Sequence, residues 1–279
     1  MHRTLGTVFV AYAAALLPAN ATADLDDPSM QQLPGPPPWL GVTMEKGTDI
    51  GVPIVKVVRG SPADKAGVKT GDRIVSVDGT KVTQPSEVSR LVQSHRIGEI
   101  AAVGIERGGS AQTQSVKLAV RPSGDQIIRM DLVGGQAPAF SNVTPIGAAP
   151  ASVAALKGKV VVLDFWATWC GPCRLVAPKL SALKDRFGAQ GLTVVGVTTD
   201  DVQLAATFME QHGMKYPSVA DGKGDTSKAY GVTSLPTMLV IDKKGVVREV
   251  FVGYESSSWT AAIGDTKVEA LVKSLLAEK

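Results

Sequence analysis

An apolar strand pattern runs almost directly into two closely spaced cysteines in the second half of this 279-residue chain. Residues 159–165 form an apolar run typical of a buried strand, and Cys170-Gly171-Pro172-Cys173 follows shortly after it. Proline favours the first turn of a helix, so a helix is expected from about Cys170, continuing past Pro178 to Phe187. Strand and helix patterns alternate from there to the C-terminus. This alternation predicts an α/β domain with a central sheet.

The two cysteines are the only ones in the sequence, and both lie in one motif. Cysteines this close cannot cross-link distant parts of a fold, so the pair indicates chemistry. Thiol-disulfide exchange needs a thiolate to attack and a second thiol nearby to release the product. A helix N-terminus lowers the pKa of a cysteine there, so we assign Cys170 as the attacking nucleophile. Cys173, one turn inward and expected to be less exposed, is the resolving thiol.

A pair of cysteines with this spacing also forms half of many zinc sites, which need two further Cys or His ligands. Beyond the N-terminal segment only His95 and His212 remain, and neither lies at ligand spacing. We therefore expect no metal and no other cofactor.

The N-terminus has the pattern of an export signal. His2 and Arg3 precede an apolar run over residues 8–17, and Ala21-Thr22-Ala23 forms a cleavage site. We expect cleavage after Ala23 and a periplasmic or otherwise extracytoplasmic protein. The alternative is an uncleaved membrane anchor, although the run is shorter than the roughly 20 residues that a bilayer needs. The formal charge of +3, without a strong basic run, argues against nucleic acid as a partner.

Composition shifts divide the chain after the signal peptide (1–23) into two modules. A proline-rich linker (24–37) leads to a mostly-β module (38–121), with strands expected at 53–58, 73–77, 99–107 and 115–120 and helices at 61–67 and 85–93. A second linker (122–131) leads to the α/β module (132–279). Its further strands are expected at 192–198, 237–242 and 246–252, and its further helices at 202–212 and 267–277.

The residues around the cysteines carry a family resemblance. The stretch from Val162 to Trp169, leading into the cysteine motif, resembles the active-site strand, turn and helix of thioredoxin. Leu235-Pro236-Thr237 resembles the cis-proline loop of that family, which lies beside the cysteines and offers backbone groups to an extended substrate. The resemblance implies a thioredoxin fold and a redox-active disulfide between Cys170 and Cys173. It also implies substrate contacts at Gly171, Pro172, Leu235 and Thr237, with Pro236 in the catalytic set. Trp166 and Trp169 could both flank the substrate groove, but tryptophan packs inside proteins more often than it contacts a substrate. We assign Trp169 to substrate contact and Trp166 to packing.

Two further features resemble the TlpA and ResA group of exported thioredoxin-like proteins. These are the segment 135–140 before the first strand and a helix-containing insert over residues 200–230. At three positions the sequence differs from most members of this group. Val176 stands where many of these relatives have an acidic residue, Asp164 where Asn is frequent, and Thr237 where cytochrome-maturation members often carry Glu.

Asp164 interrupts an otherwise apolar strand. Burial without a charge partner raises the pKa of a carboxyl group and lets it exchange a proton with Cys173. Thioredoxin places a lysine near this aspartate, at a position that matches Gly196 here, so we expect a still higher pKa. The alternative is an aspartate in a water-filled pocket with ordinary titration.

The first module resembles a PDZ domain of the HtrA type over about residues 38–121. The resemblance rests on Trp39-Leu40-Gly41-Val42, the helix over 61–67, the stretch 71–79 and Arg107-Gly108-Gly109. In such domains the loop matching Leu40, Gly41 and Val42 binds a peptide's terminal carboxylate while the peptide adds a strand to the sheet. The helix with Val88, Leu91 and Val92 is expected to form the opposite wall. The alternative is a PDZ fold used only as a spacer or a lid.

Together these features predict an extracytoplasmic thiol-disulfide oxidoreductase that reduces protein disulfides, with a membrane thiol donor as its electron source. Two rivals remain open at this point. One is a disulfide oxidase or isomerase, because the same fold and cysteines serve either direction. The other is a non-enzymatic adaptor in which the PDZ module dominates.

Overall fold

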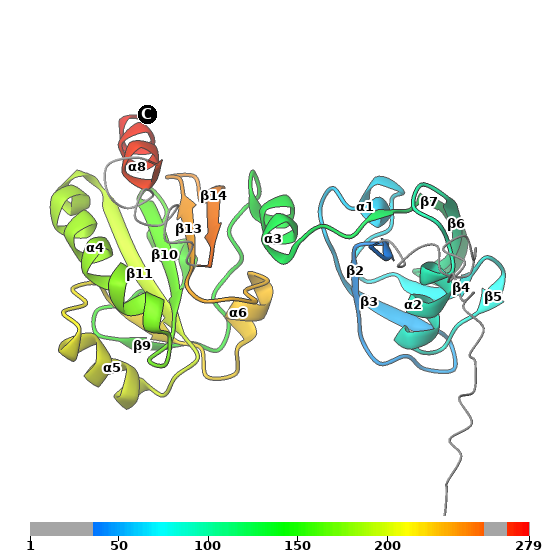
Figure 1. The fold of residues 1–279 in the computed structure, drawn as a ribbon, viewed down its shortest axis with the longest axis horizontal. Helices are drawn as coiled ribbons and strands as arrows, with labels where there is room; N and C mark the ends of the chain where they lie inside the picture. Colours follow the sequence, from blue (N-terminus) through cyan, green and yellow to red (C-terminus); the bar gives the residue numbers. More distant parts are fainter. Residues whose placement is uncertain (1–35, 254–266, 279) are drawn as a thin grey trace, which may run out of the picture. The chain divides into compact units, whose positions relative to one another are not determined.

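The computed structural model describes residues 36–253 and 267–278, which fold into the two domains coloured from blue to red in Figure 1. Each domain is described by itself. The predicted signal peptide (1–23) and nearly all of the linker 24–37 lie outside the described residues. Among the helices in the described ranges, none combines the length and apolar character needed to cross a membrane.

The first domain is mostly β structure. Its elements are β1 (Pro38–Trp39), β2 (Val42–Met44), β3 (Val52–Val57), α1 (Pro62–Lys65), β4 (Arg73–Val77), β5 (Thr80–Lys81), α2 (Pro85–Gln93), β6 (Ile100–Arg107), β7 (Ser110–Lys117) and β8 (Ala119–Val120). The main sheet has the order β2-β3-β4-β6-β7, and its neighbours are antiparallel. A core of Val, Ile, Leu and Ala side chains lies between this sheet and the two helices.

Local signals place the helices of this domain where the sequence predicted them. Ser61 caps α1, since its side chain accepts a hydrogen bond from the Asp64 backbone N–H at 3.2 Å, and Pro62 opens the helix. The predicted helix 85–93 is α2. The predicted strand 115–120 is wrong in extent: β7 begins at Ser110, and residues 119–120 form β8. The first half of β7 is polar and exposed, so the sequence alone does not indicate a strand there, and its pairing with β6 is needed to identify it.

A buried ion pair holds the turn before β4 to the end of β6. Asp72 is almost fully buried, and its two carboxylate oxygens each accept a hydrogen bond from the Arg107 guanidinium at 2.7 Å. The same guanidinium donates to the Gly67 carbonyl, and the Lys69 N–H donates to Asp72. The Arg107 hydrogen bonds hold the pKa of the Asp72 carboxyl below its usual value.

The second domain is built on a mixed sheet. Its strands are β9 (Thr144–Ile146), β10 (Val160–Trp166), β11 (Leu192–Thr198), β12 (Ser218–Ala220), β13 (Thr237–Ile241) and β14 (Val247–Val252). Its helices are α3 (Gly124–Leu132), α4 (Gly171–Phe187), α5 (Val202–Gln211), α6 (Asp225–Ala229) and α8 (Lys267–Ala277), with short 3-10 turns at Val153–Leu156 and Gly188–Gln190. The strand order is β14-β13-β10-β11-β12-β9, with β10, β11 and β12 mutually parallel.

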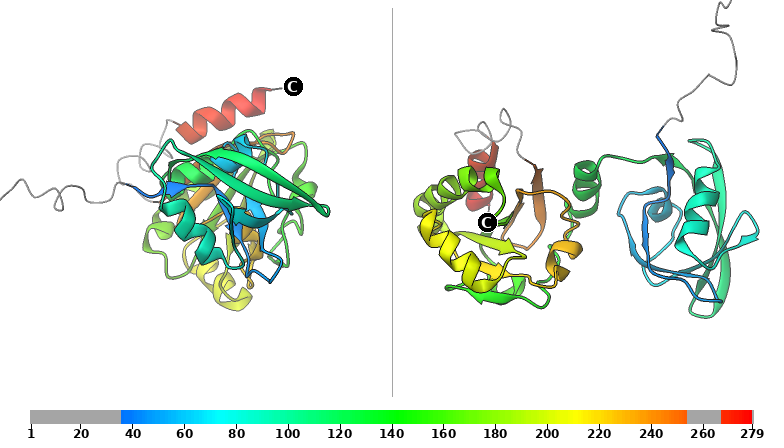
Figure 2. Two further views of the ribbon diagram at one scale, coloured as in Figure 1. Left: turned by 90° about the vertical axis from the view of Figure 1, so that its right-hand side faces the viewer. Right: turned by 60° about the horizontal axis from the view of Figure 1, so that its bottom comes forward.

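Alternate residues of β10 enter two different cores. Val160, Val162 and Trp166 pack with α4, α5 and α8 on one face, whereas Val161, Leu163 and Phe165 pack with α3 and the end of α6 on the other. Figures 1 and 2 show α4 and α5 on the same side of β10 and β11. Because both faces are covered, the strand reads as a continuous apolar run. Asp164 belongs to the α4 face by this alternation.

The sequence predicted a linker at 122–131, but the structure has a helix over most of this segment. Residues 124–132 form α3, which begins with a capping box between Ser123 and Gln126. Ile128 and Leu132 are buried in the core on the α3 side of the second sheet, and Arg129 forms an ion pair with Glu249 on β14. The helix therefore belongs to the second domain.

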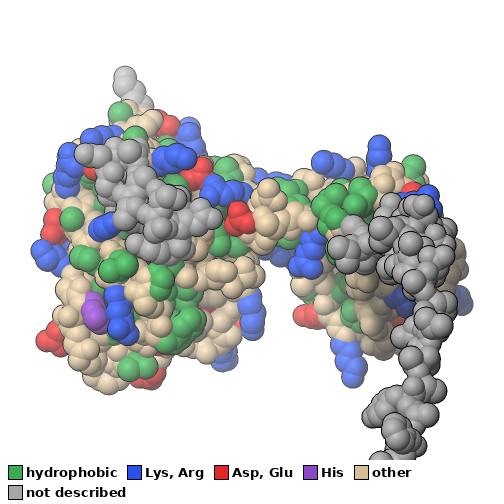
Figure 3. Space-filling view, in the orientation of Figure 1, with side chains coloured by type: hydrophobic (Ala, Val, Ile, Leu, Met, Phe, Trp, Pro, Cys, Tyr) green, Lys and Arg blue, Asp and Glu red, His purple; other side chains and the backbone are tan. Residues whose placement is uncertain are grey.

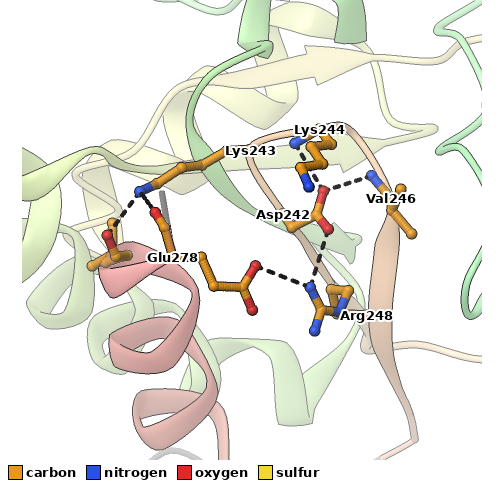
Figure 4. A network of polar contacts seen from close by, with 7 residues as sticks. Asp242, Lys243, Lys244, Val246, Arg248 and Glu278 are labelled. Carbon is orange, nitrogen blue, oxygen red and sulfur yellow. Dashed lines mark hydrogen bonds and ion pairs between the residues drawn. The ribbon is translucent and has the colours of Figure 1, made fainter.

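A polar network ties the end of α8 to the β13–β14 hairpin (Figure 4). Asp242 accepts hydrogen bonds from the N–H groups of Lys244 and Val246, which fixes the turn. Arg248 contacts both Asp242 and Glu278 at 3.2 Å. Lys243 donates to the Leu276 carbonyl at 2.8 Å, where a cation favours the negative end of a helix.

Basic side chains are interspersed with acidic and uncharged ones over the described residues on the face drawn in Figure 3. This distribution agrees with the low net charge of the sequence.

Replacing Arg107 with Ala should destabilise the first domain, because Asp72 is left buried and charged without its partner. We expect a loss of stability larger than that of an ordinary surface substitution but below the full cost for a deeply buried pair, since Arg107 is partly exposed. Hydrogen exchange of the β6 amides in the full-length protein measures this directly. Arg90→Ala, on the exposed side of α2, is the matched control and should cost less than about 1 kcal/mol. Equal effects of the two changes would contradict this account of the ion pair.

Candidate active site

The cysteine motif lies where β10 ends and α4 begins. Cys170 is the N-cap residue of α4, and Cys173 lies in its first turn. The two form a disulfide with their Cα atoms 5.3 Å apart, and the Cys173 N–H donates to the Cys170 sulfur at 3.3 Å. The unpaired N–H groups of a helix start favour a negative charge on this sulfur when the disulfide is reduced.

The two cysteines are almost equally buried. Cys173 was expected to be less exposed than Cys170, and in the disulfide it is 3% exposed against 4% for Cys170, a small difference of the expected sign. The reason is that both sulfurs pack into the α4-side core with Trp166 and Val176. In the oxidised state, exposure therefore does not distinguish the nucleophile from the resolving thiol, whereas their positions in the helix do.

The loop before Cys170 is held by a residue that the sequence analysis missed. The Thr168 N–H donates to the Asp200 carboxylate at 2.6 Å, and Arg174 donates to the Thr168 carbonyl at 3.2 Å. Asp200 follows β11, the parallel neighbour of β10. The carboxyl ends of parallel strands meet at one edge of a sheet. Knowing that β10 and β11 are neighbours would therefore have placed Asp200 near the cysteine motif.

The proline loop reaches the same edge of the sheet. The Leu235–Pro236 bond is cis, the geometry that the resemblance implies. Thr237 starts β13, which pairs antiparallel with β10 through Phe165, so Pro236 lies at the edge where β10 ends. Thr237 itself is fully buried, and its hydroxyl donates to the Ser234 carbonyl at 2.7 Å. Its side chain therefore does not form part of the surface that we predicted for substrate.

Several residues near the cysteines in the sequence, and Leu235 of the proline loop, reach the surface. Trp169 is 71% exposed and Leu175 is 54% exposed, while Gly171 is exposed and Pro172 and Leu235 are half-buried. Trp166, by contrast, is buried and stacks on Phe208 with ring centroids 5.2 Å apart. Trp166 thus packs inside, and Trp169 lies at the surface, where its contact with substrate stays a prediction.

The Asp164 side chain is almost fully buried, with 2% of its surface exposed. The Tyr216 hydroxyl donates to Oδ2 at 2.7 Å, and Oδ1 is buried without a hydrogen-bond partner among the described residues. Burial raises the pKa of the Asp164 carboxyl from 3.8 to about 7, and the Tyr216 hydrogen bond opposes this increase. The group therefore changes its protonation state near neutral pH.

Gly196 lies beside Asp164 in the sheet, and the packing leaves no room for a side chain there. A Cβ at this position would approach Ser218 Oγ to 2.2 Å and Trp166 Nε1 to 2.6 Å. These two atoms are themselves buried without partners among the described residues. A small polar cluster of Asp164, Tyr216, Ser218 and the Trp166 indole thus underlies this face of the sheet.

Tyr216 and Ser218 were not found from the sequence. They lie around β12, a three-residue strand with no alternation of its own, and Tyr216 is 52 positions from Asp164 along the chain. In the described parts of the chain, His, Cys, Asp and Glu do not gather in threes at metal-binding distances.

In the first domain, a groove of about 210 Å³ lies between β2 and α2. Its walls include Leu40, Gly41 and Val42, as well as Val88 and Val92 of the helix. Gly41 has a φ of +88°, and a Cβ there would lie 2.1 Å from Ser61 Cβ, so this tight loop requires glycine. Among the described strands β2 pairs with β3 alone, which leaves its other edge beside the groove. Arg121 is the charged residue of the lining.

Comparisons with known proteins agree with this geometry. The Redoxin family model matches residues 132–267, and the PDZ domain model matches residues 38–118. A thiol-disulfide oxidoreductase ResA of Bacillus thuringiensis is 35% identical over 120 residues, covering 42% of this chain and 69% of the relative. The thioredoxin-like protein YneN of Bacillus subtilis is 37% identical over 124 residues, covering 43% of this chain and 71% of the relative.

Among solved structures, a thioredoxin-family thiol:disulfide interchange protein of Chlorobium tepidum is 31% identical. It covers 53% of this chain and 99% of its own, with a TM-score of 0.43.

The identity and coverage of the ResA relatives, together with the disulfide at the start of α4, assign the second domain. The chain belongs to the ResA-like thiol-disulfide oxidoreductases of the thioredoxin fold and carries a PDZ domain before its catalytic domain.

Proposed function

We propose that this protein is an extracytoplasmic reductant of protein disulfides. The observation that carries the proposal is a disulfide at a helix start, flanked by exposed apolar groups, in a core that contains a carboxyl group titrating near pH 7. The Gly171-Pro172 pair between the cysteines is that of thioredoxin, whose reduction potential is about −270 mV. Strong oxidants of this fold lie near about −120 mV. The motif therefore favours reduction over the oxidase alternative.

The reaction transfers two electrons from the cysteines to the substrate. The Cys170 thiolate attacks one sulfur of a substrate disulfide, forming a mixed disulfide and releasing the other sulfur as a thiolate. Cys173 then loses its proton and attacks the Cys170 sulfur. This step forms the Cys170–Cys173 disulfide and releases the second substrate thiolate, and both substrate sulfurs take up protons. A dithiol donor returns the two electrons to the protein.

Asp164 is the proposed acceptor of the Cys173 proton. Its side chain belongs to the α4 face of β10, the face whose core contains Cys173. Oδ2 is engaged by Tyr216, which leaves Oδ1 for the proton. A base whose pKa lies near the working pH serves both directions of a proton transfer.

The exposed apolar groups form the proposed substrate surface. Trp169 gives a large flat contact, and Gly171, Pro172 and Leu235 border the disulfide. Pro236, at the same sheet edge, brings the loop close enough for backbone contacts to an extended chain. Such a surface binds unfolded or extended protein segments with little demand on their sequence.

The PDZ domain is the proposed recruitment module. The Leu40-Gly41-Val42 loop would bind a terminal carboxylate through its backbone N–H groups, with Arg121 as the nearby cation. The peptide would add a strand to the free edge of β2 and place its last side chain among Val42, Met44 and Val88. Linking this module to the oxidoreductase raises the local concentration of a bound substrate at Cys170.

The cellular setting follows from the predicted signal peptide. Outside the cytoplasm the surroundings are oxidising, so a reductant there needs a continuous supply of electrons. We infer a membrane thiol protein as the donor.

Cys173→Ser should accumulate mixed disulfides with substrate proteins, because the resolving thiol is gone while the nucleophile remains. Non-reducing electrophoresis and mass spectrometry of the full-length protein measure the adducts. Cys170→Ser is the matched control and should trap at least about tenfold less. Equal trapping by the two variants would refute the assigned roles, and no trapping by either would support a non-enzymatic adaptor.

Asp164→Asn should stabilise the oxidised protein at high pH. Because folding raises the pKa from 3.8 to about 7, the native state binds the proton more tightly than the unfolded state. The wild type therefore loses up to about 4 kcal/mol from this group as pH rises from 4 to 8. The neutral variant lacks this loss, so the two proteins should differ little at pH 4 and clearly at pH 8. Urea unfolding at the two pH values tests this, and a difference independent of pH would contradict it.

Val42→Glu should weaken peptide binding at the PDZ groove at least about tenfold, since it places a like charge beside the peptide carboxylate. Thr43→Glu, on the exposed side of β2 and outside the groove lining, is the control and should bind normally. Fluorescence anisotropy with short peptides ending in valine, either free or amidated at the C-terminus, measures both variants. Equal binding of free and amidated peptides would argue against carboxylate recognition.

A further inference from the structure

The hydrogen bond between Tyr216 and Asp164 joins two buried groups from separate parts of the second domain. Tyr216 is 1% exposed, and its hydroxyl lies 2.7 Å from Asp164 Oδ2. The ring packs in the core that also contains Cys173 and Trp166. Burial and the neighbouring carboxylate keep the pKa of the Tyr216 hydroxyl well above its usual value, so this group remains a donor.

The sheet explains why the donor comes from Tyr216 and not from the adjacent strand. Asp164 pairs with Gly196 on β11, and Gly196 pairs with Ser218 on β12. A side chain at position 196 would collide with Ser218 Oγ and the Trp166 indole. Position 196 of β11 therefore has no room for a cationic side chain that could pair with Asp164. Tyr216, just before β12, reaches across the missing side chain instead.

The surroundings of Asp164 hold few other titratable groups. In the sheet, Asp164 lies beside Gly196 of β11 and Met238 of β13, and Gly196 pairs in turn with Ser218 of β12. The core on this face of β10 contains Phe208 of α5, Val272 of α8 and the two cysteines at the start of α4. Arg174 and His212 both lie against the Phe208 ring. Among the described residues of this core, the titratable side chains besides Asp164 are Tyr216 and, once the disulfide is reduced, the two cysteines.

We propose that Tyr216 is a positioning residue for the thiol-disulfide exchange of this protein. Its hydroxyl holds Oδ2 of Asp164, stabilises the ionised carboxylate with one neutral hydrogen bond, and directs Oδ1 to the proton of Cys173. The inference rests on the proposed proton-acceptor role of Asp164 and deepens it. Tyr216 sets the pH at which the acceptor becomes available, without exchanging a proton itself.

The arrangement has a direct consequence for the pH dependence. A hydrogen bond to the charged form of an acid lowers its pKa, whereas burial raises it. Removing the hydroxyl leaves burial unopposed, so the carboxylate forms only at higher pH. Strengthening the donor has the opposite effect.

The test is the rate at which the reduced full-length protein reduces insulin under single-turnover conditions, measured from pH 5 to 10. The Asp164-dependent midpoint is defined as the one that disappears in Asp164→Asn. In Tyr216→Phe we expect this midpoint to move up by about one pH unit. Site-specific replacement of Tyr216 by difluorotyrosine, a stronger donor of similar shape, should move it down.

Tyr230→Phe is the matched control. Tyr230 is also fully buried in this domain, and its hydroxyl donates to the Pro138 carbonyl at 2.7 Å, but it packs on the opposite face of the sheet. This change should leave the midpoint where it is in the wild type. A general loosening of the fold would move both tyrosine variants alike.

Three outcomes would overturn the inference. They are an unchanged midpoint in Tyr216→Phe, a shift of the same sign with difluorotyrosine, and an equal shift in Tyr230→Phe. A failure of the underlying role is distinguishable, because Asp164→Asn would then have the same pH profile as the wild type. If Tyr216→Phe does not fold, the difluorotyrosine protein alone decides by the direction of its shift.

Discussion

This site depends on a carboxyl group that is buried beside the active-site helix and has no charged partner among the described residues. Asp164 lies in the middle of β10, between Gly196 and Met238 in the sheet, with one hydrogen bond to Tyr216. An isolated carboxylate is expensive to bury, so the group responds by holding its proton up to about pH 7. Burying this carboxyl group costs the fold stability, and in return a proton acceptor is available inside a mostly apolar core.

The sheet order gives this constraint its chemical use. β10 and β11 run parallel and β13 runs antiparallel, so the end of β10, the end of β11 and the start of β13 meet at one edge. The disulfide, Asp200 and Pro236 come together there, although they are far apart in the sequence. Asp200 fixes the loop before Cys170, while the proline loop borders the surface where Trp169 is exposed. Recruitment through the PDZ groove adds a second contact with the substrate without changing this centre.

Parts of this arrangement were predictable from the sequence because their signals are local. The apolar run of β10, the proline in the cysteine motif, the capping residue of α1 and the apolar spacing in α2 specify these elements without reference to the rest of the chain. Asp164 was predictable because one charge interrupts an apolar strand. Trp166, which we assigned to packing, is buried, whereas the contact assigned to Trp169 stays a prediction.

The rest depends on pairing that the sequence does not display. Tyr216 contacts Asp164 only because β12 joins the sheet beside β11, and the collision at Gly196 requires Trp166 and Ser218 at once. The polar half of β7 is a strand because β6 pairs with it, and α3 is a helix within a segment whose Pro122-Ser123-Gly124 start indicated a linker. The equal burial of the two cysteines reflects packing of the disulfide, which position in a helix does not predict.

The central claim is that Asp164 changes its protonation state near neutral pH inside the folded protein. Carbon-13 labelling of aspartate in the oxidised full-length protein, with Asp164→Asn to assign the signal, allows its carboxyl resonance to be titrated directly. The account predicts a midpoint at about 7. A midpoint close to the ordinary value of 3.8 would contradict it.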